Sequence, residues 1–450
     1  MNKRPYEIRD PIHGLIELSQ KELDIINTKA FQRLRRIRQL AMAFLVYPGT
    51  LHTRFDHSIG VMHIAGRICE QLKSSAGIET KECDGIRLAA LLHDIGHGPF
   101  SHVSEYLLDL YAPNQASENS DREKIHERVT VDIVKSESEI KEVLSSEERK
   151  FIIDMIVGKP TRDFKRDIIS SDLDADKMDY LLRDSYFAGV KYGTYDLDKI
   201  VESCRVHFEE DESYLAISDE GNHALEQLLL AKHHMTQQVY RHRVRSISDA
   251  MIVRGIELAI NQGNQELQKL YQYRENSNFI DNYIEYHDER LIDILMRCDQ
   301  EKGRRIFERL YRRQLFKMIG ELPLKRVDSA PAKRRLLQMH QSQRRQWEEG
   351  IARHLRIDPD EVIVNKLQTG NPNYGSRSYS INPEAVMIYD EAQSGLRSLS
   401  RYGSELVLVR PPTDEADLET VQVCAPQDER NSQQFLLQLQ EKVQEILLSS

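Results

Sequence analysis

The sequence predicts a mainly α-helical protein with a small α+β subdomain at its C-terminal end. Apolar residues recur at about helical spacing through most of the first 310 residues. After about residue 320, short strand candidates alternate with loops rich in glycine, proline, asparagine and serine. We therefore expect a helical domain over residues 1–320, including a short β-hairpin near its N-terminus, and an α+β subdomain over residues 321–450.

The expected hairpin is the segment PIHGLIELS, in which apolar and polar residues alternate around Gly14. An amphipathic helix should follow over Gln20–Gln39, because its apolar residues are three to five positions apart with arginines between them. Further helices are expected over Ser58–Leu72, Gly85–His93, His126–Ser136, Ser146–Ile156, Lys177–Phe187, His223–Tyr240 and Ser246–Gln262.

The change of character near residue 320 is marked by the segment ELPLKRVDSAPAK, where two prolines and a serine interrupt the helical pattern. A basic helix over Ala332–Ile351 and a final helix over Ser432–Leu448 are expected beyond it. Strands are expected over Val362–Leu367, Ala385–Tyr389, Glu405–Val409 and Thr420–Val423.

Composition narrows the class of protein. The 450 residues carry a formal net charge of −10, which argues against a surface made for nucleic acid, although a local basic patch stays compatible with it. No apolar run approaches the roughly 20 residues that cross a bilayer, and the opening MNKRPYEIRDP lacks the apolar core of a signal peptide. We expect a cytoplasmic protein without membrane contact.

The five cysteines form no CxxC pair, so neither a disulfide framework nor a thiolate zinc site is indicated.

The segment LLHDIGHGPFSH concentrates chemistry-bearing residues. Its two glycines and proline predict that a helix ends near His93 and Asp94, so that both side chains can point at one place. A histidine and a carboxylate suit a divalent metal that accepts nitrogen and oxygen ligands. Other candidate ligands are His52 and His57 upstream and the acidic residues of SSDLDADKMDYLLRD downstream. The alternative for each is a satisfied polar side chain or a solvated helix face.

These residues resemble a known family. His57, the pair His93-Asp94 and Asp176 match in order the H…HD…D ligands of the HD-domain metal-dependent phosphohydrolases. The segments DPIHGLIEL, FQRLRRIRQL, YPGTLHTRFDHSIGV, LLHDIGHGPFSH, IHE and DADKMDYLLRDS together resemble its deoxynucleoside triphosphate (dNTP) triphosphohydrolase branch. The resemblance covers roughly residues 5 to 265. It implies an HD-domain helical core and hydrolysis of a dNTP to a deoxynucleoside and inorganic triphosphate.

The resemblance assigns metal ligation to His57, His93, Asp94 and Asp176. This nitrogen and oxygen set is compatible with Mn²⁺, Mg²⁺, Fe²⁺ or Co²⁺. Such a metal would polarise a phosphoryl oxygen and lower the pKa of a bound water.

A general acid must protonate the 5′-oxygen that leaves the α-phosphorus, and a histidine titrates in the required range. His102 is the candidate, with Glu105 three residues later to orient its imidazole. His97 and His126 fall on family positions from which they would contact phosphates or stabilise charge in the transition state.

Substrate binding is assigned by the same resemblance. Arg54, Lys177 and Lys232 would contact the triphosphate. Tyr180 would pack under the deoxyribose, Asp184 would accept a hydrogen bond from its 3′-hydroxyl, and Gln39 would approach the sugar. For Tyr180 the alternative is plain core packing, and for Lys232 it is a solvated helix face.

Regulation and partners follow from the family as well, whose members are often homo-oligomers (dimers or tetramers) activated by nucleotides. Asn27, Gln32 and Arg35 match a stretch that binds an effector base, but Asn27 replaces an acidic residue that would recognise guanine. A nucleotide effector site is therefore expected without guanine specificity. The basic region Lys302–Arg345 could contact effector phosphates, nucleic acid or an acidic partner, or could be exposed helix surface.

Two other functions stay open at this point. One is an HD phosphohydrolase that acts on another nucleotide or phosphate ester. The other is a nucleotide-sensing or nucleic-acid-binding protein with a structural metal. His102, Glu105 and His126 favour an enzyme, because a protein that only binds needs no general acid.

Overall fold

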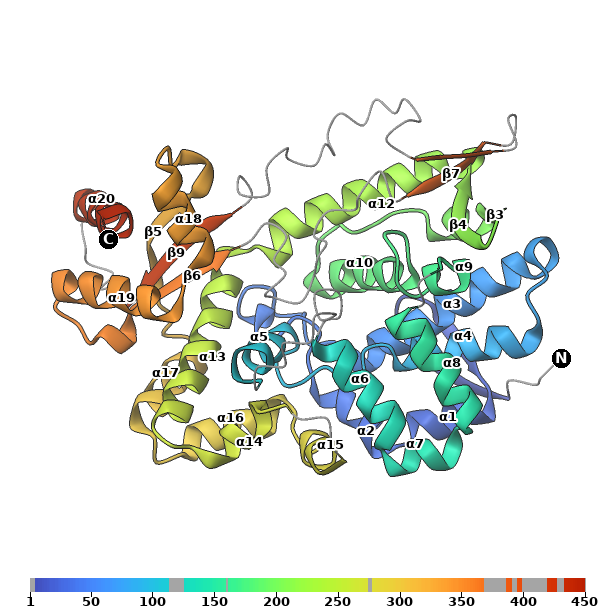
Figure 1. The fold of residues 1–450 in the computed structure, drawn as a ribbon, viewed down its shortest axis with the longest axis horizontal. Coiled ribbons are helices and arrows are strands. Elements are labelled where there is room, and N and C mark those ends of the chain that lie inside the picture. Colours follow the sequence, from blue (N-terminus) through green and yellow to red (C-terminus); the bar gives the residue numbers. More distant parts are fainter. Residues whose placement is uncertain are drawn as a thin grey trace. The chain divides into compact units, whose positions relative to one another are not determined.

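The computed structural model describes residues 5–112, 125–158, 161–273, 277–367, 386–390, 395–398, 419–426 and 433–449. These residues are mainly helical and contain three small sheets, which confirms the predicted fold class (Figure 1). Two compact units divide the chain. The first consists of Met1–Tyr240, Lys269–Leu291 and Ser378–Arg410, and the second of Arg241–Gln268, Ile292–Arg377 and Pro411–Ser450. The division into domains at residue 320 stays a prediction.

The N-terminal hairpin of the first unit forms as predicted. Strand β1 (Tyr6–Asp10) pairs antiparallel with β2 (Gly14–Leu18), and Asp10 lies opposite Gly14. Gly14 has φ +75°, a left-handed conformation that favours glycine at this turn.

The single helix predicted over Gln20–Gln39 is wrong. The chain forms α1 (Gln20–Ile26), α2 (Lys29–Gln32) and a 3₁₀ turn (Arg33–Arg36) instead. The break comes at Thr28, whose hydroxyl accepts a hydrogen bond from the Phe31 amide and so caps a new helix. The apolar spacing survives the break because residues from all three pieces reach the core.

Longer helices make up most of the first unit. They are α3 (Arg54–Ala76), α4 (Thr80–Leu92), α5 (His102–Tyr111), α6 (Ile125–Ser136), α7 (Ser138–Val143), α8 (Ser146–Val157), α9 (Phe164–Asp167), α10 (Ala175–Ala188), α11 (Leu197–Glu202), α12 (Asn222–Met235) and α15 (Ser277–Tyr283). Helix α3 packs against both α4 and α10, so these three helices surround one buried region. The helices predicted in these ranges form, although the last turn of His223–Tyr240 is a π-helix (Thr236–Tyr240).

A four-stranded sheet completes the first unit, in the order β3 (Cys204–Glu209), β4 (Glu212–Ser218), β7 (Met387–Asp390) and β8 (Gly395–Ser398). Strands β3 and β4 form a hairpin in a region predicted to be mostly helical. Its turn residue Glu210 has φ 50° and is not a glycine, so no turn signal marked it. Strand β7 overlaps the predicted strand Ala385–Tyr389 and ends one residue beyond it, whereas Glu405–Val409 lies outside the described residues.

The second unit combines helices with an antiparallel sheet in the order β5 (Lys317–Pro323), β9 (Thr420–Ala425) and β6 (Ile363–Leu367). Its helices are α13 (Arg243–Asn261), α17 (Glu301–Tyr311), α18 (Ala330–Gln338), α19 (Gln341–Leu355) and α20 (Gln433–Ser449). The basic helix predicted over Ala332–Ile351 is two helices, separated at Met339, whose φ of 29° ends α18. Trp347 lies in the core of this unit with apolar residues of the sheet and α20.

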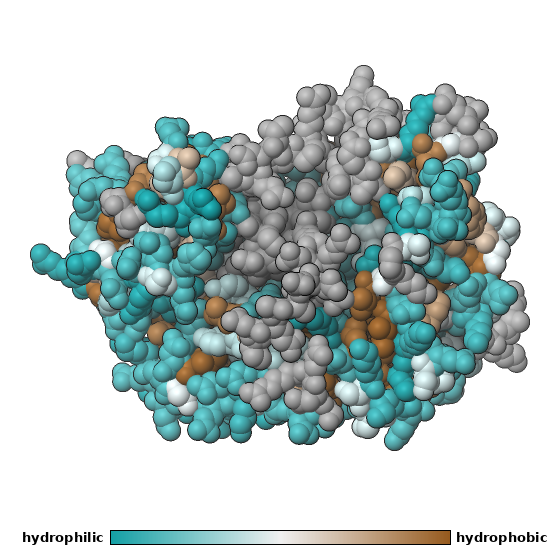
Figure 2. Space-filling model, in the orientation of Figure 1, coloured by the Kyte–Doolittle hydropathy of each residue, from teal (hydrophilic) through white to brown (hydrophobic). Residues whose placement is uncertain are grey.

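Two helices, α14 (Gln265–Tyr271) and α16 (Asp288–Arg297), contain residues of both units. In the described part of the chain, no helix combines the length and the apolar character that crossing a membrane requires. Where it is coloured, the face drawn in Figure 2 is mainly hydrophilic, with smaller hydrophobic areas between the hydrophilic residues. All five cysteines are buried free thiols.

Candidate active site

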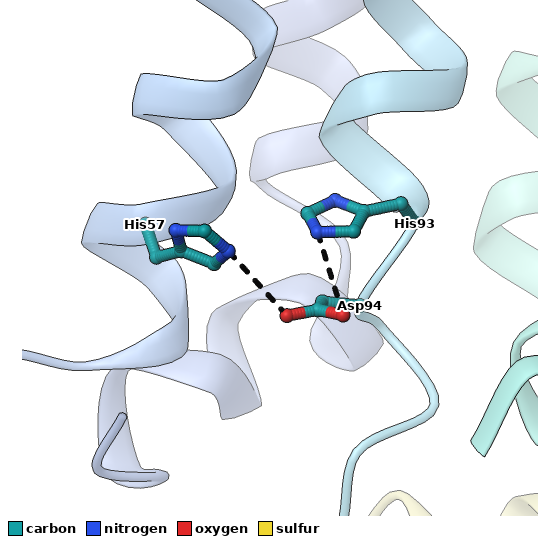
Figure 3. Close-up of side chains that lie close together, drawn as sticks. All are labelled: His57, His93 and Asp94. Carbon is teal, nitrogen blue, oxygen red and sulfur yellow. Dashed lines mark ion pairs between the residues drawn. The ribbon is translucent and has the colours of Figure 1, made fainter. Parts of the chain in front are cut away.

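Four candidate metal ligands converge inside the first unit. His57 projects from the first turn of α3 and Asp176 from the first turn of α10. His93 and Asp94 directly follow α4, which ends at Leu92 as the glycines and the proline predict. The His57 Nε2 atom lies 3.0 Å from Asp176 Oδ1 and 3.6 Å from Asp94 Oδ2. The His93 Nε2 atom lies 3.4 Å from Asp94 Oδ1, and Figure 3 shows both imidazoles directed at this carboxylate.

The surroundings of these atoms fit a divalent cation. The Nε2 atoms of His57 and His93 are buried and make no hydrogen bond to the described residues. Burial lowers the pKa of His57, but Asp176 and Asp179 outweigh this effect and raise that pKa to about 10. The carboxylates thus attract positive charge to the place where both Nε2 atoms point. Because a metal ion replaces protons on its ligands, these residues suit Mn²⁺, Mg²⁺, Fe²⁺ or Co²⁺.

A second cluster adjoins this centre, where three histidines surround one carboxylate. Glu105 Oε1 lies 3.0 Å from Nδ1 of His97, 3.0 Å from Nδ1 of His102 and 3.1 Å from Nδ1 of His126. Burial raises the pKa of Glu105, but the three imidazoles outweigh it and hold that pKa well below its usual range. His97 also connects the clusters, since its Nε2 lies 3.3 Å from Asp94 Oδ1.

The three histidines of this cluster differ in how much of their side chains is exposed to solvent. The His102 side chain is 29% exposed, whereas those of His97 and His126 are 2% and 8% exposed. The rings of His97 and His126 stack with centroids 4.2 Å apart. Of the three, His102 is therefore the imidazole that a substrate in the site can reach most readily, and Glu105 fixes its orientation.

Two family models match this chain. The HD domain matches residues 54–184, which contain all four candidate ligands, and the HD associated region matches residues 195–390. The chain is an HD-domain protein.

The curated relatives of this chain include uncharacterised proteins and proteins named as dNTP triphosphohydrolases. An uncharacterised protein of Methanocaldococcus jannaschii is 39% identical over 263 residues, which are 58% of this chain and 52% of that protein. The deoxynucleoside triphosphate triphosphohydrolase SAMHD1 homolog of Dictyostelium discoideum is 31% identical over 328 residues, 70% of this chain and 60% of that protein. The chain spans about half the length of the curated relatives it matches.

A crystal structure of a hypothetical protein from Aquifex aeolicus resembles this structure over nearly its full length. It is 28% identical, has a TM-score of 0.67, and the match covers 98% of this chain and 99% of that one. The similarity therefore includes the residues on either side of the HD domain.

The loop of the HD domain that carries Asp94 and His97 is held through its backbone. Arg33 donates from one guanidinium nitrogen to the carbonyls of Ile95 and His97, at 2.7 Å each. The Tyr283 hydroxyl donates to the Gly96 carbonyl at 3.0 Å. A Cβ at Gly96 would lie 2.3 Å from the His126 carbonyl oxygen, so only glycine allows this approach.

Two of the three predicted phosphate-binding residues, Arg54 and Lys177, are paired with acidic groups. Arg54 is buried, donates to Asp94, and contacts the Ser101 hydroxyl at 3.0 Å, while its Nη2 makes no hydrogen bond to the described part of the chain. The Lys177 ammonium lies 2.7 Å from Asp174 Oδ2. Lys232 is buried, and burial together with Lys177 lowers its pKa well below the usual value.

The predicted sugar-binding residues lie near the same centre. Asp184 accepts hydrogen bonds from His52 Nε2 at 2.7 Å and from the Tyr240 hydroxyl at 2.8 Å. The Tyr180 ring centroid lies 6.1 Å from that of Tyr240 and 6.5 Å from that of His57. Gln39 Oε1 is buried without a hydrogen bond to any described residue.

The three candidate effector residues form a separate group. Asn27 is exposed at the end of α1, and Gln32 donates to the nearby Ile26 carbonyl at 2.7 Å. Arg35 donates to Gln32 Oε1 at 3.0 Å, and its guanidinium carbon lies 3.4 Å from the centroid of the Phe55 ring. Gln32 and Arg35 thus contact each other, and Phe55 lies two residues before the candidate ligand His57.

Arg33 and Tyr283 have no role in the sequence analysis, and both contact the loop from distant parts of the chain. His52 and Asp179 were named there only as candidate metal ligands. In the structure His52 contacts Asp184, and Asp179 contacts Nδ1 of the candidate ligand His57. Asp179 had one local signal, because its position four residues before Arg183 on a helix favours an ion pair.

Proposed function

We propose that this protein hydrolyses a dNTP to a deoxynucleoside and inorganic triphosphate, with a divalent metal held by His57, His93, Asp94 and Asp176. The observation that carries the proposal is the position of a partly exposed, carboxylate-oriented His102 beside this candidate ligand set. The similarity to curated dNTP triphosphohydrolases supports the choice of substrate. A bound divalent metal would supply polarisation of a phosphoryl oxygen and a more acidic water.

His102 is the proposed general acid. Water attacks the α-phosphorus, the bond from phosphorus to the 5′-oxygen breaks, and His102 gives its proton to that oxygen. Glu105 holds the imidazole through Nδ1 and stabilises its protonated form, as a carboxylate near a cationic histidine does. The stacked pair His97 and His126 would stabilise negative charge on the phosphoryl group in the transition state.

Separate groups of residues would bind the triphosphate and the deoxyribose of the substrate. Arg54, Lys177 and Lys232 would contact the triphosphate, which requires Lys177 to exchange the Asp174 carboxylate for phosphate oxygens. On the sugar side, His52 and Tyr240 orient Asp184 to accept from the 3′-hydroxyl. Tyr180 would pack under the deoxyribose, and Gln39 would hydrogen bond to the sugar.

Regulation belongs to the same proposal. Asn27, Gln32 and Arg35 would bind a nucleotide effector, with Arg35 stacked on Phe55 so that binding is transmitted toward α3. We further propose a homo-oligomer, a dimer or a tetramer, in which this surface is completed.

The reaction is tested by incubating Mn²⁺-loaded protein with each of the four dNTPs, separately and mixed, and separating products by anion exchange. Deoxynucleoside plus triphosphate is the expected result, and activity only in the mixture would identify an effector requirement. Release of orthophosphate from another phosphate ester, without dNTP cleavage, would favour the alternative of a different HD phosphohydrolase. Nucleotide or nucleic-acid binding without hydrolysis of any substrate would favour a sensor.

Replacement of His102 tests the acid directly. His102→Ala should lower turnover by roughly 100- to 10,000-fold, the usual contribution of a general acid. Its affinity for dNTP and its metal content should be unchanged, because His102 is not among the proposed metal ligands. His223→Ala is the matched control, since its side chain is almost fully exposed. Turnover retained in the His102 variant would remove this residue from the acid role.

A further inference from the structure

A buried hydrogen-bond network extends from the ligand His57 to the N-terminal hairpin. Asp179, on α10, accepts from His57 Nδ1 through Oδ2 at 2.9 Å and from His13 Nε2 through Oδ1 at 2.7 Å. Arg183 donates to both oxygens of the same carboxylate, at 2.8 and 2.9 Å. All four side chains are almost completely inaccessible to solvent.

The hairpin is shaped to deliver its part of this network. Asp10 Oδ1 accepts from the amides of Ile12 and His13, at 2.8 and 2.9 Å, and so closes the turn that presents the His13 ring. Asp10 Oδ2 accepts from Arg183 Nη1 at 2.8 Å. The segment DPIHG therefore contributes two side chains to the surroundings of Asp179 and none to the proposed chemistry.

Close helix packing sets the position of Asp179. A Cβ at Gly60, one turn beyond His57 on α3, would lie 1.9 Å from Asp179 Oδ1 and 2.5 Å from Arg183 Nη2. Glycine thus lets α10 approach α3 closely enough for Asp179 to reach the His57 ring.

The network determines which nitrogen of His57 carries a proton. An ionised carboxylate only accepts hydrogen bonds, so His57 Nδ1 must donate to Asp179. In a neutral imidazole the lone pair then lies on Nε2, the atom that points at Asp94 and Asp176. For His93 the helix supplies the acceptor, because its Nδ1 lies 2.7 Å from the Ala90 carbonyl. In both candidate histidine ligands, Nδ1 thus has an acceptor that leaves Nε2 for the metal. The acceptor is the Asp179 carboxylate for His57 and the Ala90 carbonyl for His93.

We propose that Asp179 is a positioning residue that holds His57 with Nε2 toward the metal, and that His13 and Arg183 hold Asp179 in place. The N-terminal hairpin is then part of the metal site although it contributes no ligand. This inference rests on the proposed metal binding by His57, His93, Asp94 and Asp176. Groups that orient a metal-bound histidine affect metal affinity almost as ligands do.

The test is the affinity of the full-length, chelator-stripped protein for Mn²⁺, measured by isothermal titration calorimetry, together with the melting temperature without metal. Asp179→Asn should weaken Mn²⁺ binding by roughly 10- to 100-fold. His13→Ala, which removes one hydrogen bond to the carboxylate, should weaken it by about two- to tenfold. Asp167→Asn is the matched control, since Asp167 is also buried and pairs with Arg162 at 3.1 Å but contacts no ligand.

The melting temperature separates positioning from structural support. A merely structural role would lower the melting temperature of Asp179→Asn and Asp167→Asn alike and leave Mn²⁺ affinity unchanged in both, which would overturn the inference. Should Asp179→Asn fail to fold, the Mn²⁺ affinity of the folded His13→Ala variant tests the inference instead. A wild-type affinity in that variant would refute the role of the hairpin. Absence of Mn²⁺ binding by the wild-type protein would instead refute the proposed metal site and this inference with it.

Discussion

The buried carboxylates of the second unit and those around the candidate metal ligands of the first unit have different partners. In the second unit, Glu348 is 1% exposed and accepts from Arg254, while Glu257 accepts from Arg344 at 2.9 and 3.1 Å. In the first unit, the Nε2 atoms of His57 and His93 are buried beside carboxylates without a hydrogen bond to the described residues. Arginines thus contact these carboxylates of the second unit. In the first unit Arg183 contacts Asp179 in the same way, but Asp176 lies beside the imidazoles of His57 and His93, at 3.0 and 3.8 Å.

This difference distinguishes buried charge that supports a fold from buried charge that binds something. An arginine–carboxylate network compensates its own desolvation, so it needs no further partner. Imidazole nitrogens that lie beside carboxylates without a hydrogen bond of their own gain most from a metal ion. The comparison predicts that substitutions in the second unit lower stability alone, and that substitutions of ligands in the first unit lower metal binding.

The largest expected effect is on the stability of the second unit. Glu348→Gln leaves Arg254 buried without its principal partner and should destabilise this unit by about 3–5 kcal/mol. Trp347, the single tryptophan of the chain, lies in the core of that unit, so its fluorescence during urea unfolding reports on it directly. Mn²⁺ affinity should not change.

The neighbouring Glu349 provides the control for this substitution. It is exposed and pairs only with Arg345 among its described ion pairs, at 3.4 Å, so Glu349→Gln should cost less than about 1 kcal/mol. Equal urea midpoints for the two variants would contradict the view that the buried network stabilises the unit.

A smaller effect is expected from removing a ligand. His93→Ala takes away one of four proposed metal ligands and should weaken Mn²⁺ binding by on the order of 3 kcal/mol, with loss of turnover. The urea midpoint reported by Trp347 should stay at its wild-type value. His207→Ala, a half-buried histidine on β3, should bind Mn²⁺ as the wild-type protein does. Unchanged Mn²⁺ affinity in His93→Ala would place the metal elsewhere.

The parts of the fold and the site that could be predicted depend on local sequence. Helix ends near His93 followed from glycine and proline, and the contact of His102 with Glu105 followed from their spacing of three residues. The ligand set needed the resemblance to a family, because His57 and Asp176 meet only through the packing of α3 against α10.

What could not be predicted depends on long-range contacts or on single backbone residues. His13 and Asp179 are 166 residues apart, and nothing in either segment indicates the other. The helix expected over Gln20–Gln39 was wrong because the Thr28 cap outweighs an apolar periodicity that its separate pieces also satisfy. The β3–β4 hairpin lacked a turn signal because its left-handed residue is Glu210.

The buried carboxylate of Asp288 is an intermediate case, because backbone amides and one arginine are its partners. The change in the pH dependence of stability that its replacement should cause is the smallest of the predicted effects. It is fully buried and accepts from the amides of Phe100 and Arg38, at 2.7 and 3.0 Å, with the Arg38 guanidinium at 3.5 Å. Burial raises its pKa to about 6, and the two amides only partly oppose this rise. Because the folded pKa exceeds the unfolded value, the stability from the protonated form is complete below about pH 4 and lost as pH rises through 6.

Asp288→Asn removes this titration. From about pH 5 to pH 7, the wild-type protein should therefore lose about 1 kcal/mol more stability than the variant does. The asparagine also costs stability at every pH, because its amide group opposes a backbone donor, so only the slope with pH is informative. Chemical denaturation of both proteins over this range, followed by far-ultraviolet circular dichroism, measures it. Parallel slopes would mean that the backbone amides suffice to keep the carboxylate ionised, and would place Asp288 with the fully compensated charges of the second unit.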